Sequence, residues 1–184
     1  MRVILLKKTI LYFVKKINQL LYREYDIDNC PHSQLLILKL GFFQKILGIN
    51  RKVKWPVHPT STFIAPEKII PGTRTPGLAK NCFFDARNGI VIGKNVWIAH
   101  GVNFISQDHS NIDYNQYKTE NPIVIGDNCL IGANSIILPG VQLGEHTIVG
   151  AGSVVTKSFL EGNIIIAGNP AKIVKKIGEY KCVV

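Results

Sequence analysis

A single histidine of this 184-residue sequence stands where a side chain could carry out acid–base chemistry. His109 follows Asp108 and comes directly before residues 110–122, which interrupt an otherwise regular repeat. A loop that leaves a rigid scaffold can form the wall of a pocket, and the scaffold fixes a side chain at the base of that loop. Imidazole can take up a proton near neutral pH, so His109 is the candidate for proton transfer. The alternative is an exposed corner histidine without a catalytic role.

The other histidines and the cysteines have no comparable setting. His32 precedes a predicted helix, His58 adjoins a proline, and His100 and His146 occupy middle positions of the repeat that should face solvent. The four cysteines lie far apart and form no Cys-x-x-Cys pair. We therefore expect neither a metal site nor a disulfide framework, and a reducing compartment is the expected location.

The scaffold around His109 is predicted from a repeat of six residues. Each unit begins with an aliphatic or aromatic residue, usually followed by glycine or another small residue. The units begin at Ile92, Ile98 and Phe104 before the interruption, and at Ile125, Ile131, Ile137, Leu143, Val149 and Val155 after it. A period of six fits neither an amphipathic helix nor an alternating strand, and β-sandwiches lack a fixed internal period. The repeat instead predicts an all-β solenoid, a parallel β-helix in which three units close one coil.

The register of the repeat predicts how the chain is divided. We expect a helical leader and cap over residues 1–56, a β-helix over 57–177 with the excursion 110–122, and a short tail over 178–184. The coils are expected at 57–74, 75–91, 92–109, 125–142 and 143–160. Three residues fall at equivalent places and should stack on one another: Trp97, Leu130 and Ile148.

The leader carries most of the positive charge. Residues 1–54 contain 11 Lys and Arg against 3 Asp and Glu, which gives +8 of the net +10 of the chain. From Arg2 to Arg23, apolar residues recur at helical spacing with lysines between them, which predicts an amphipathic helix. A second helix is expected from near Ser33 to Gly48. Its apolar stripe is predicted to be Leu36, Leu40, Phe43 and Leu47.

Two roles for these helices stay open. They could cover the strand edges of the first coil, or the basic helix within residues 1–24 could lie on an anionic membrane surface. No apolar run approaches the ~18 residues of a spanning helix, and Lys7 and Lys8 interrupt any signal-peptide core. We therefore expect a cytoplasmic protein, with peripheral contact to the inner membrane face as the further option. Nucleic-acid binding is not expected, because the basic residues accompany an apolar stripe and not base-stacking aromatics.

Several segments of the sequence resemble the hexapeptide-repeat acyltransferases, in particular the sugar and polysaccharide O-acetyltransferases that include maltose and galactoside acetyltransferases. These segments are the repeats with Asp108 and His109 before the interruption, the restart at Pro122 to Asp127, the stretch from Val149 to Lys157, and the closing stretch from Ala167 to Lys172. The resemblance covers roughly residues 57–177 and implies that the β-helix is left-handed. It is specific for the superfamily and only weakly specific for the acceptor.

The resemblance implies an acetyl-CoA-dependent O-acetyltransferase that needs no metal and forms a homotrimer with its sites at the subunit interfaces. It implies that His109 is the general base. A sugar hydroxyl is a weak nucleophile at neutral pH, and an imidazole can remove its proton as the oxygen attacks the thioester carbonyl. The expected acceptor is a sugar or a polysaccharide precursor, and direct transfer requires no covalent enzyme intermediate.

Acceptor-binding candidates come from the same comparison, and they are Asn81, Asp85, Asp108 and Glu120. Asn81 and Asp85 resemble the Asn and Asp that family members place one coil before the catalytic histidine, although the stretch around them is shorter here. Under the strict repeat Asp85 would point inward, so either the coil is broken there or Asp85 is a buried structural carboxylate. Glu120 resembles the loop glutamate of galactoside acetyltransferases but stands closer to Pro122, and the alternative is a solvated loop charge.

Coenzyme A is expected to lie in the groove between neighbouring prisms. The family uses small residues for close backbone approach to pantetheine, and the equivalent residues here are Gly132, Ala133, Gly150 and Ala151. Polar and basic residues near the last coils would contact the rest of the cofactor: Thr156, Lys157, Lys172 and Lys175. An ordinary basic tail is the alternative for Lys175 and its neighbour Lys176. Several sugar acetyltransferases have Trp where this chain has Leu130, so cofactor packing is expected to differ.

Other functions on this scaffold are weighed against the same residues. N-acylation of an amino-sugar nucleotide and acetylation of an antibiotic are the nearest enzymatic alternatives. The leader has no room for the long helical domain of serine acetyltransferases. A carbonic anhydrase would need three histidines converging on zinc, and the spacing of His100, His109 and His146 does not fit. A catalytically silent assembly protein is disfavoured because the segments that carry the resemblance are intact.

Overall fold

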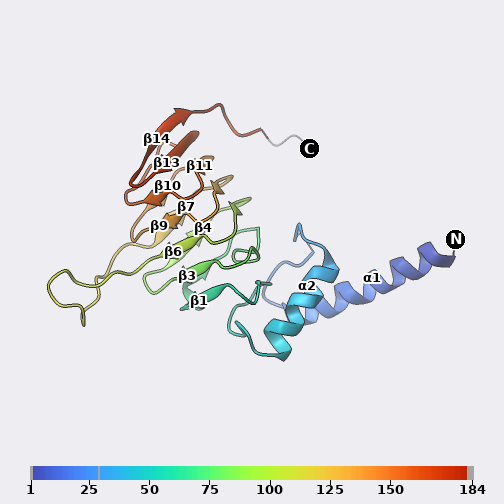
Figure 1. The fold of residues 1–184 in the computed structure, drawn as a ribbon. Helices are drawn as coiled ribbons and strands as arrows, with labels where there is room; N and C mark the ends of the chain where they lie inside the picture. Colours follow the sequence, from blue (N-terminus) through green and yellow to red (C-terminus); the bar gives the residue numbers. More distant parts are fainter. Residues whose placement is uncertain (1, 29, 182–184) are drawn as a thin grey trace.

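The computed structural model is a parallel β-solenoid of about five turns with two helices before it, which confirms the predicted left-handed β-helix fold (Figure 1). Residues 2–28 and 30–181 are described, with side chains from Lys7 onward. The predicted leader therefore includes Met1 and Asn29, and the predicted tail includes 182–184, which lie outside the described residues.

Three sheets form the sides of the solenoid. The first contains β1 (Thr62–Ile64), β3 (Phe83–Asp85), β6 (Asn103–Ile105), β9 (Ile136–Ile137) and β12 (Val154–Val155). The second contains β2 (Ile69–Ile70), β4 (Ile90–Ile92), β7 (Ile123–Ile125) and β10 (Gln142–Leu143). The third contains β5 (Trp97–Ile98), β8 (Leu130–Ile131), β11 (Thr147–Val149), β13 (Ile164–Gly168) and β14 (Ala171–Lys176). From β1 to β13, consecutive strands lie in different sheets, so the chain turns a corner between them.

Parallel pairing between coils gives the register that the repeat predicts. Trp97 pairs with Leu130, and Leu130 pairs with Ile148, so the predicted stack of these three residues is confirmed. At the C-terminal end of the third sheet, β14 turns back and pairs antiparallel with β13. The last coil is thus covered by a strand of its own chain.

The core of the solenoid is a column of side chains at the first positions of the repeat. Phe84 and Phe104 are fully buried and stack with their ring centroids 5.0 Å apart. Phe63 continues the column in the first coil, with its ring centroid 4.9 Å from that of Phe84. Cys129 is buried as predicted, and burial raises the pKa of its thiol to about 11.

Asparagines allow the chain to turn between the second and third sheets. Asn95 and Asn128 have φ angles of 53° and 59°, in the left-handed region that asparagine tolerates better than most residues. The side-chain amide of Asn95 donates to Oδ1 of Asn128, 2.9 Å away in the next coil. These corner residues therefore support one another from coil to coil.

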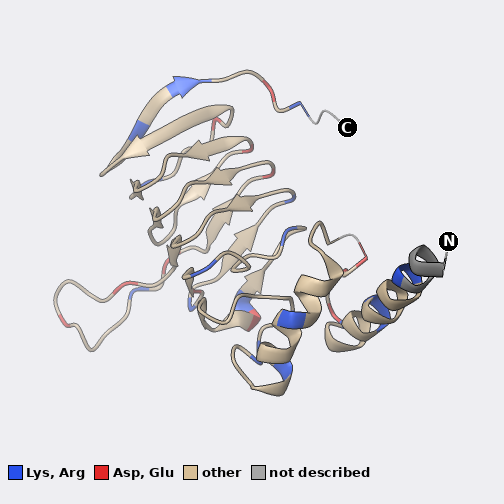
Figure 2. Ribbon diagram, turned by 45° about the vertical axis from the view of Figure 1, so that its right-hand side comes forward, with Lys and Arg blue, Asp and Glu red and all other residues tan. Residues whose placement is uncertain are grey.

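The leader consists of α1 (Arg2–Leu21) and α2 (Gln34–Gly41), which continues as a π-helical turn over Phe42–Ile46. A short 3₁₀ turn, Pro66–Lys68, lies in the first coil. Lys and Arg are frequent along both leader helices (Figure 2). No helix among the described residues is long and apolar enough to cross a membrane.

Of the apolar stripe predicted for the second helix, Leu40 is buried as expected, and the prediction is wrong for Leu36 and Leu47. The helix buries Ile37, Leu40 and Gln44, while Leu36 and Leu47 are exposed. Gln44 is drawn inward because its amide donates to the carbonyls of Val53 and Trp55, at 2.8 and 3.0 Å. Its Oε1 also accepts from the hydroxyl of Tyr22, 2.9 Å away. A buried glutamine thus joins both helices to the entry of the first coil.

Replacing Phe84 by alanine tests the aromatic column. We expect Phe84→Ala to lower the free energy of unfolding by about 3–5 kcal/mol, because it leaves a cavity between two stacked rings. Urea denaturation would measure the loss. Ile70→Ala is the control, because Ile70 is 59% exposed and its truncation should cost less than about 1 kcal/mol. Equal losses for the two variants would contradict the proposed role of the column.

Candidate active site

The excursion that begins near His109 leaves the solenoid at the corner between the first and second sheets. It connects the end of β6 to the start of β7 and therefore covers residues 106–122. The excursion begins four residues earlier than the predicted 110–122. In Figure 1 the excursion projects from the side of the solenoid, whereas the leader extends from another side. The same corner of the coil below is formed by residues 86–89, between β3 and β4.

Two arms of the excursion are hydrogen-bonded to each other near the solenoid. His109 and Tyr117 form an antiparallel bridge. The amide of Ser110 donates to the carbonyl of Gln116 at 2.8 Å, and the amide of Lys118 donates to the carbonyl of Asp108 at 2.9 Å. His109 therefore lies on a closed stem and not on a free loop.

The stem determines which nitrogen of His109 can act as a base. Nδ1 of His109 lies within hydrogen-bonding distance of the carbonyl oxygen of Tyr114. A carbonyl can only accept, so Nδ1 carries the proton, and in the neutral ring Nε2 presents its lone pair. The imidazole also packs against the ring of Tyr117, with ring centroids 4.6 Å apart. The His109 side chain is exposed, so Nε2 can meet an acceptor from solution.

A buried ion pair supports the stem from the coil below. Asp85, at the end of β3, is 3% exposed and accepts from Arg87 at 2.9 Å (Nε) and 2.7 Å (Nη2). Hydrogen bonding to Asp85 raises the pKa of Arg87. The guanidinium in turn lies 5.0 Å from the ring centre of Tyr117, the residue that packs on His109. Of the two readings left open for Asp85, the structure shows the buried structural carboxylate.

Asn88 holds both arms of the stem to the solenoid. Its amide nitrogen donates to the Ser106 hydroxyl at 2.9 Å. Its side-chain amide donates to the carbonyl of Ser106 at 2.9 Å and to that of Lys118 at 3.1 Å. Sequence reasoning missed Arg87, Asn88 and Tyr117. The signal available was the irregular stretch 81–89, whose slip in the repeat falls one coil below the interruption.

Of the other acceptor candidates, Asp108 and Glu120 lie on the excursion, whereas Asn81 lies outside it. Asp108 is exposed and its carboxylate accepts from the His109 amide at 2.8 Å. Glu120 is exposed on the returning arm, and a Cβ added at Gly140 of the next coil would lie 3.8 Å from its Oε2. Asn81 precedes β3 at the opposite edge of the first sheet, where its amide donates to Thr60 Oγ1 at 3.0 Å. Within one chain the structure does not bring Asn81 to His109.

The small residues predicted to line the cofactor groove do stack at one corner. The amide of Gly132 donates to the carbonyl of Val149 at 2.9 Å, and the amide of Gly152 donates to that of Ala133 at 2.8 Å. A Cβ at Gly132 would lie 2.6 Å from the Ala151 nitrogen, so no side chain fits there. This corner, between the third and first sheets, presents bare backbone to an approaching molecule.

The basic cofactor candidates lie elsewhere on the upper coils. Thr156 and Lys157 are exposed and follow β12, at the corner from which the excursion also leaves. Lys172 and Lys175 are exposed on β14 and pair with Ala167 and Ile165 of β13. Within one chain, the small-residue corner and the corner that carries His109 therefore lie apart.

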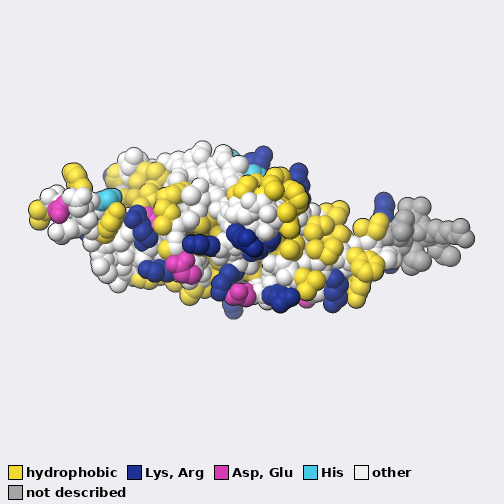
Figure 3. Space-filling model, turned by 90° about the horizontal axis from the view of Figure 1, so that it is seen from below, with side chains coloured by type: hydrophobic (Ala, Val, Ile, Leu, Met, Phe, Trp, Pro, Cys, Tyr) yellow, Lys and Arg dark blue, Asp and Glu magenta, His cyan; other side chains and the backbone are white. Residues whose placement is uncertain are grey.

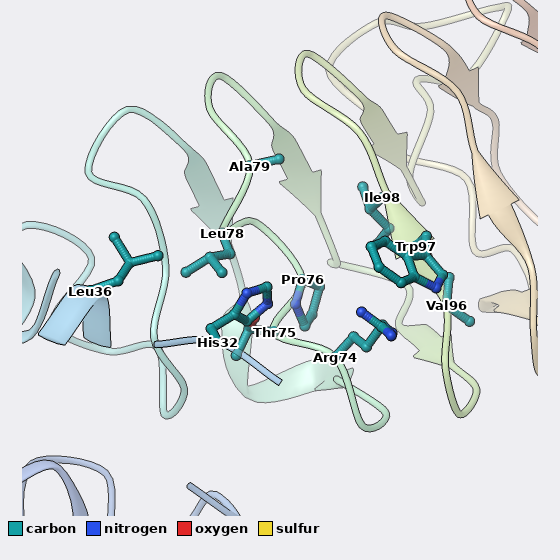
Figure 4. A pocket seen from close by; sticks show the side chains of 10 residues that line it. All are labelled: His32, Leu36, Arg74, Thr75, Pro76, Leu78, Ala79, Val96, Trp97 and Ile98. Carbon is teal, nitrogen blue, oxygen red and sulfur yellow. The ribbon is translucent and has the colours of Figure 1, made fainter. Parts of the chain in front are cut away.

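A separate pocket lies between the leader and the third sheet (Figure 4). Its volume is about 310 Å³, and His32 and Leu36 of the leader form one side. On the solenoid side the Arg74 guanidinium lies 3.5 Å from the ring centre of Trp97. Burial, and secondarily the charge of Arg74, lower the pKa of His32. The excursion contributes no residue to this pocket.

Comparison with known proteins places the repeat in a family. Residues 122–157 match the family described as the hexapeptide repeat of succinyl-transferase. These residues carry the repeat that this family shares. The protein CapG of Staphylococcus aureus is 48% identical to it over 96 residues, which cover 50% of this chain and 55% of CapG. The hexapeptide-repeat chain spans about half the length of the curated relatives it matches.

Solved structures share the fold of this hexapeptide-repeat chain. A galactoside acetyltransferase in complex with coenzyme A has a TM-score of 0.62 and 24% identity, covering 91% of this chain and 82% of that one. AntD, an N-acyltransferase from Bacillus cereus in complex with dTDP and coenzyme A, has a TM-score of 0.53 and 20% identity, covering 66% and 80%. At these identities the likeness is one of fold.

Replacing Arg87 tests whether the Asp85–Arg87 pair supports the excursion. We expect Arg87→Met to lower the free energy of unfolding by about 2 kcal/mol, because it leaves the Asp85 carboxylate buried without its donor. Proteolysis within residues 106–122 should become faster as the contact with Tyr117 is lost.

Urea denaturation and timed trypsin digestion would measure the two effects. Arg51→Met is the control, because Arg51 is exposed outside this network. The double variant Asp85→Asn, Arg87→Met should recover part of the stability, since no buried charge remains. Wild-type stability and digestion of Arg87→Met would contradict the assignment.

Proposed function

We propose that the protein is an acetyl-CoA-dependent O-acetyltransferase that acts on a hydroxyl of a sugar or a polysaccharide precursor, with His109 as general base. The observation that carries the proposal is the exposed imidazole whose Nδ1 is engaged by the Tyr114 carbonyl, which leaves Nε2 available. The fold shared with a coenzyme A-bound galactoside acetyltransferase supports the class of reaction.

The transfer is a single displacement at the thioester. Nε2 of His109 takes the proton of the acceptor hydroxyl as its oxygen bonds to the carbonyl carbon, and the carbon–sulfur bond then breaks to release the CoA thiolate. The proton on Nε2 is afterwards passed to that thiolate or to water. The Tyr114 carbonyl holds the Nδ1 proton in place and favours the imidazolium that forms in the transition state.

The features around the prism fit coenzyme A. The corner at Gly132 and Ala151 allows close approach of the pantetheine arm to the backbone, because the residues there are small and none of them is buried. Exposed lysines on the upper coils, Lys157 and Lys172 among them, offer positive charge for the phosphates.

We further propose that three chains form the enzyme. The small-residue corner and the His109 corner are different corners of one solenoid. A groove between neighbouring chains would place the small-residue corner of one chain next to the His109 corner of another. Such an arrangement would also place Asn81 near an acceptor bound by a neighbouring chain. This assembly follows the closed symmetry typical of homo-oligomers.

The variant His109→Asn tests the base assignment. We expect turnover to fall about 10²–10⁴-fold, the usual contribution of a general base, while coenzyme A binding is retained. Thiol release in the presence of pooled sugar acceptors would measure turnover, and isothermal titration would measure coenzyme A binding. His146→Asn is the matched control, because His146 lies at the corner between the second and third sheets, away from the excursion and from the small-residue corner. Unchanged turnover in His109→Asn would contradict the assignment.

The bond formed in the product tests the O-transfer. An acetyl ester of a sugar hydroxyl is removed by alkaline hydroxylamine, whereas an acetamide is not. We expect the acetylated sugar to lose its acetyl group under this treatment, as followed by mass spectrometry. A product that resists hydroxylamine would overturn O-transfer in favour of N-transfer, which the shared fold of AntD also supports.

A further inference from the structure

An apolar stripe along α1 faces outward from the protein. Ile10, Phe13, Ile17 and Leu20 follow one another at intervals of three and four residues and are 51%, 60%, 44% and 64% exposed. Every residue from Lys7 to Phe13 is exposed, so this half of the helix extends beyond the body of the chain (Figure 1). An apolar stripe on a helix is normally covered by another surface, so this stripe calls for a partner.

The row of residues next to the stripe fixes the direction in which the stripe faces. Val14, Asn18 and Tyr22 are buried. The Asn18 side-chain amide donates to the carbonyl of Gln34 at 2.8 Å, and the Tyr22 hydroxyl donates to Oε1 of Gln44 at 2.9 Å. The helix cannot roll over to bury its stripe without breaking these buried hydrogen bonds.

Positive charge lies along the same helix as the stripe. The first 23 residues contain no Asp or Glu, and Lys7, Lys8 and Lys16 are exposed on α1. The fourth lysine, Lys15, pairs with Asp28 at 2.9 Å. Seen from below, hydrophobic side chains and Lys or Arg side chains lie next to one another along the leader (Figure 3).

The second helical segment adds to the same kind of surface. Leu35, Phe42 and Ile46 are 57%, 52% and 67% exposed, and Lys39 among them is also exposed. Their spacing of seven and four residues places the three apolar side chains on one side of the helix. The leader thus exposes apolar and basic side chains on both of its helices.

We propose that the leader docks on the surface of a bilayer that contains anionic phospholipids. The stripe of α1 enters the boundary between headgroups and acyl chains, and the lysine side chains extend to the phosphates. Each lysine near such a surface contributes roughly fivefold to the affinity. The proposal does not depend on the acetyltransferase assignment, because no residue of the excursion takes part.

Charge favours lipid over a second copy of this chain. Two copies of α1 packed stripe to stripe would bring their lysines together with no acidic residue on either helix to offset them. A bilayer with anionic headgroups accepts the apolar stripe and offsets the lysine charge at once. A nucleic acid would satisfy the lysines and leave the stripe in water.

Vesicle flotation of the full chain tests the proposal. The vesicles are phosphatidylcholine alone or phosphatidylcholine with phosphatidylglycerol. We expect wild-type protein to float with the anionic vesicles and at least tenfold less with the neutral ones. Phe13→Asp with Ile17→Asp, and separately Lys7→Gln with Lys8→Gln and Lys16→Gln, should each weaken binding to the anionic vesicles at least tenfold.

Matched controls carry the same changes elsewhere on the exposed surface. Leu160→Asp is the apolar control, and Lys80→Gln with Lys94→Gln and Lys181→Gln is the charge control; both should float as the wild type does. Circular dichroism shows whether each variant folds. The proposal is overturned if wild-type protein stays in the dense fraction or if the stripe variant floats unchanged. It is equally overturned if that variant changes only the molar mass in light scattering, which would indicate a second copy as the partner.

Discussion

Hydrogen bonding between successive coils is the constraint on which the rest of this structure depends. Each strand inside a sheet pairs with the strand of the coil above and with that of the coil below, as Phe84 pairs with Phe63 and with Phe104. An inserted segment within a strand would leave these backbone groups unpaired, at a cost comparable to a lost hydrogen bond for each. Insertions are therefore confined to the corners, and the excursion of residues 106–122 leaves at one of them.

The corner where the excursion leaves is held by polar contacts from the coil below. Asp85 and Arg87 form a buried pair under Tyr117, and Asn88 binds carbonyls of both arms. These contacts fix the stem, and the stem fixes the imidazole of His109 through the Tyr114 carbonyl. The solenoid thus supplies rigidity, and the irregular corner supplies the functional group.

The sequence was sufficient for the parts governed by the six-residue period. The pairing of Leu130 with Ile148 follows from counting, because the two residues are three units of six apart. The burial of Gln44 could not be predicted from the period. A polar residue is buried where it finds hydrogen-bonding partners, which here are two carbonyls and a tyrosine hydroxyl. The Arg87–Tyr117 contact joins two irregular segments whose conformations the repeat does not determine. Asn81 was expected near His109, but within one chain the two residues lie at opposite ends of the first-sheet strands.

The protonation state of the His109 ring tests the central claim most directly. Nitrogen-15 NMR of the neutral imidazole distinguishes a protonated from an unprotonated ring nitrogen, and His109→Asn assigns the signal. The hydrogen bond to the Tyr114 carbonyl predicts a proton on Nδ1 and a bare Nε2. A proton fixed on Nε2, or rapid averaging between the two nitrogens, would contradict the assignment of His109 as a base held by its stem.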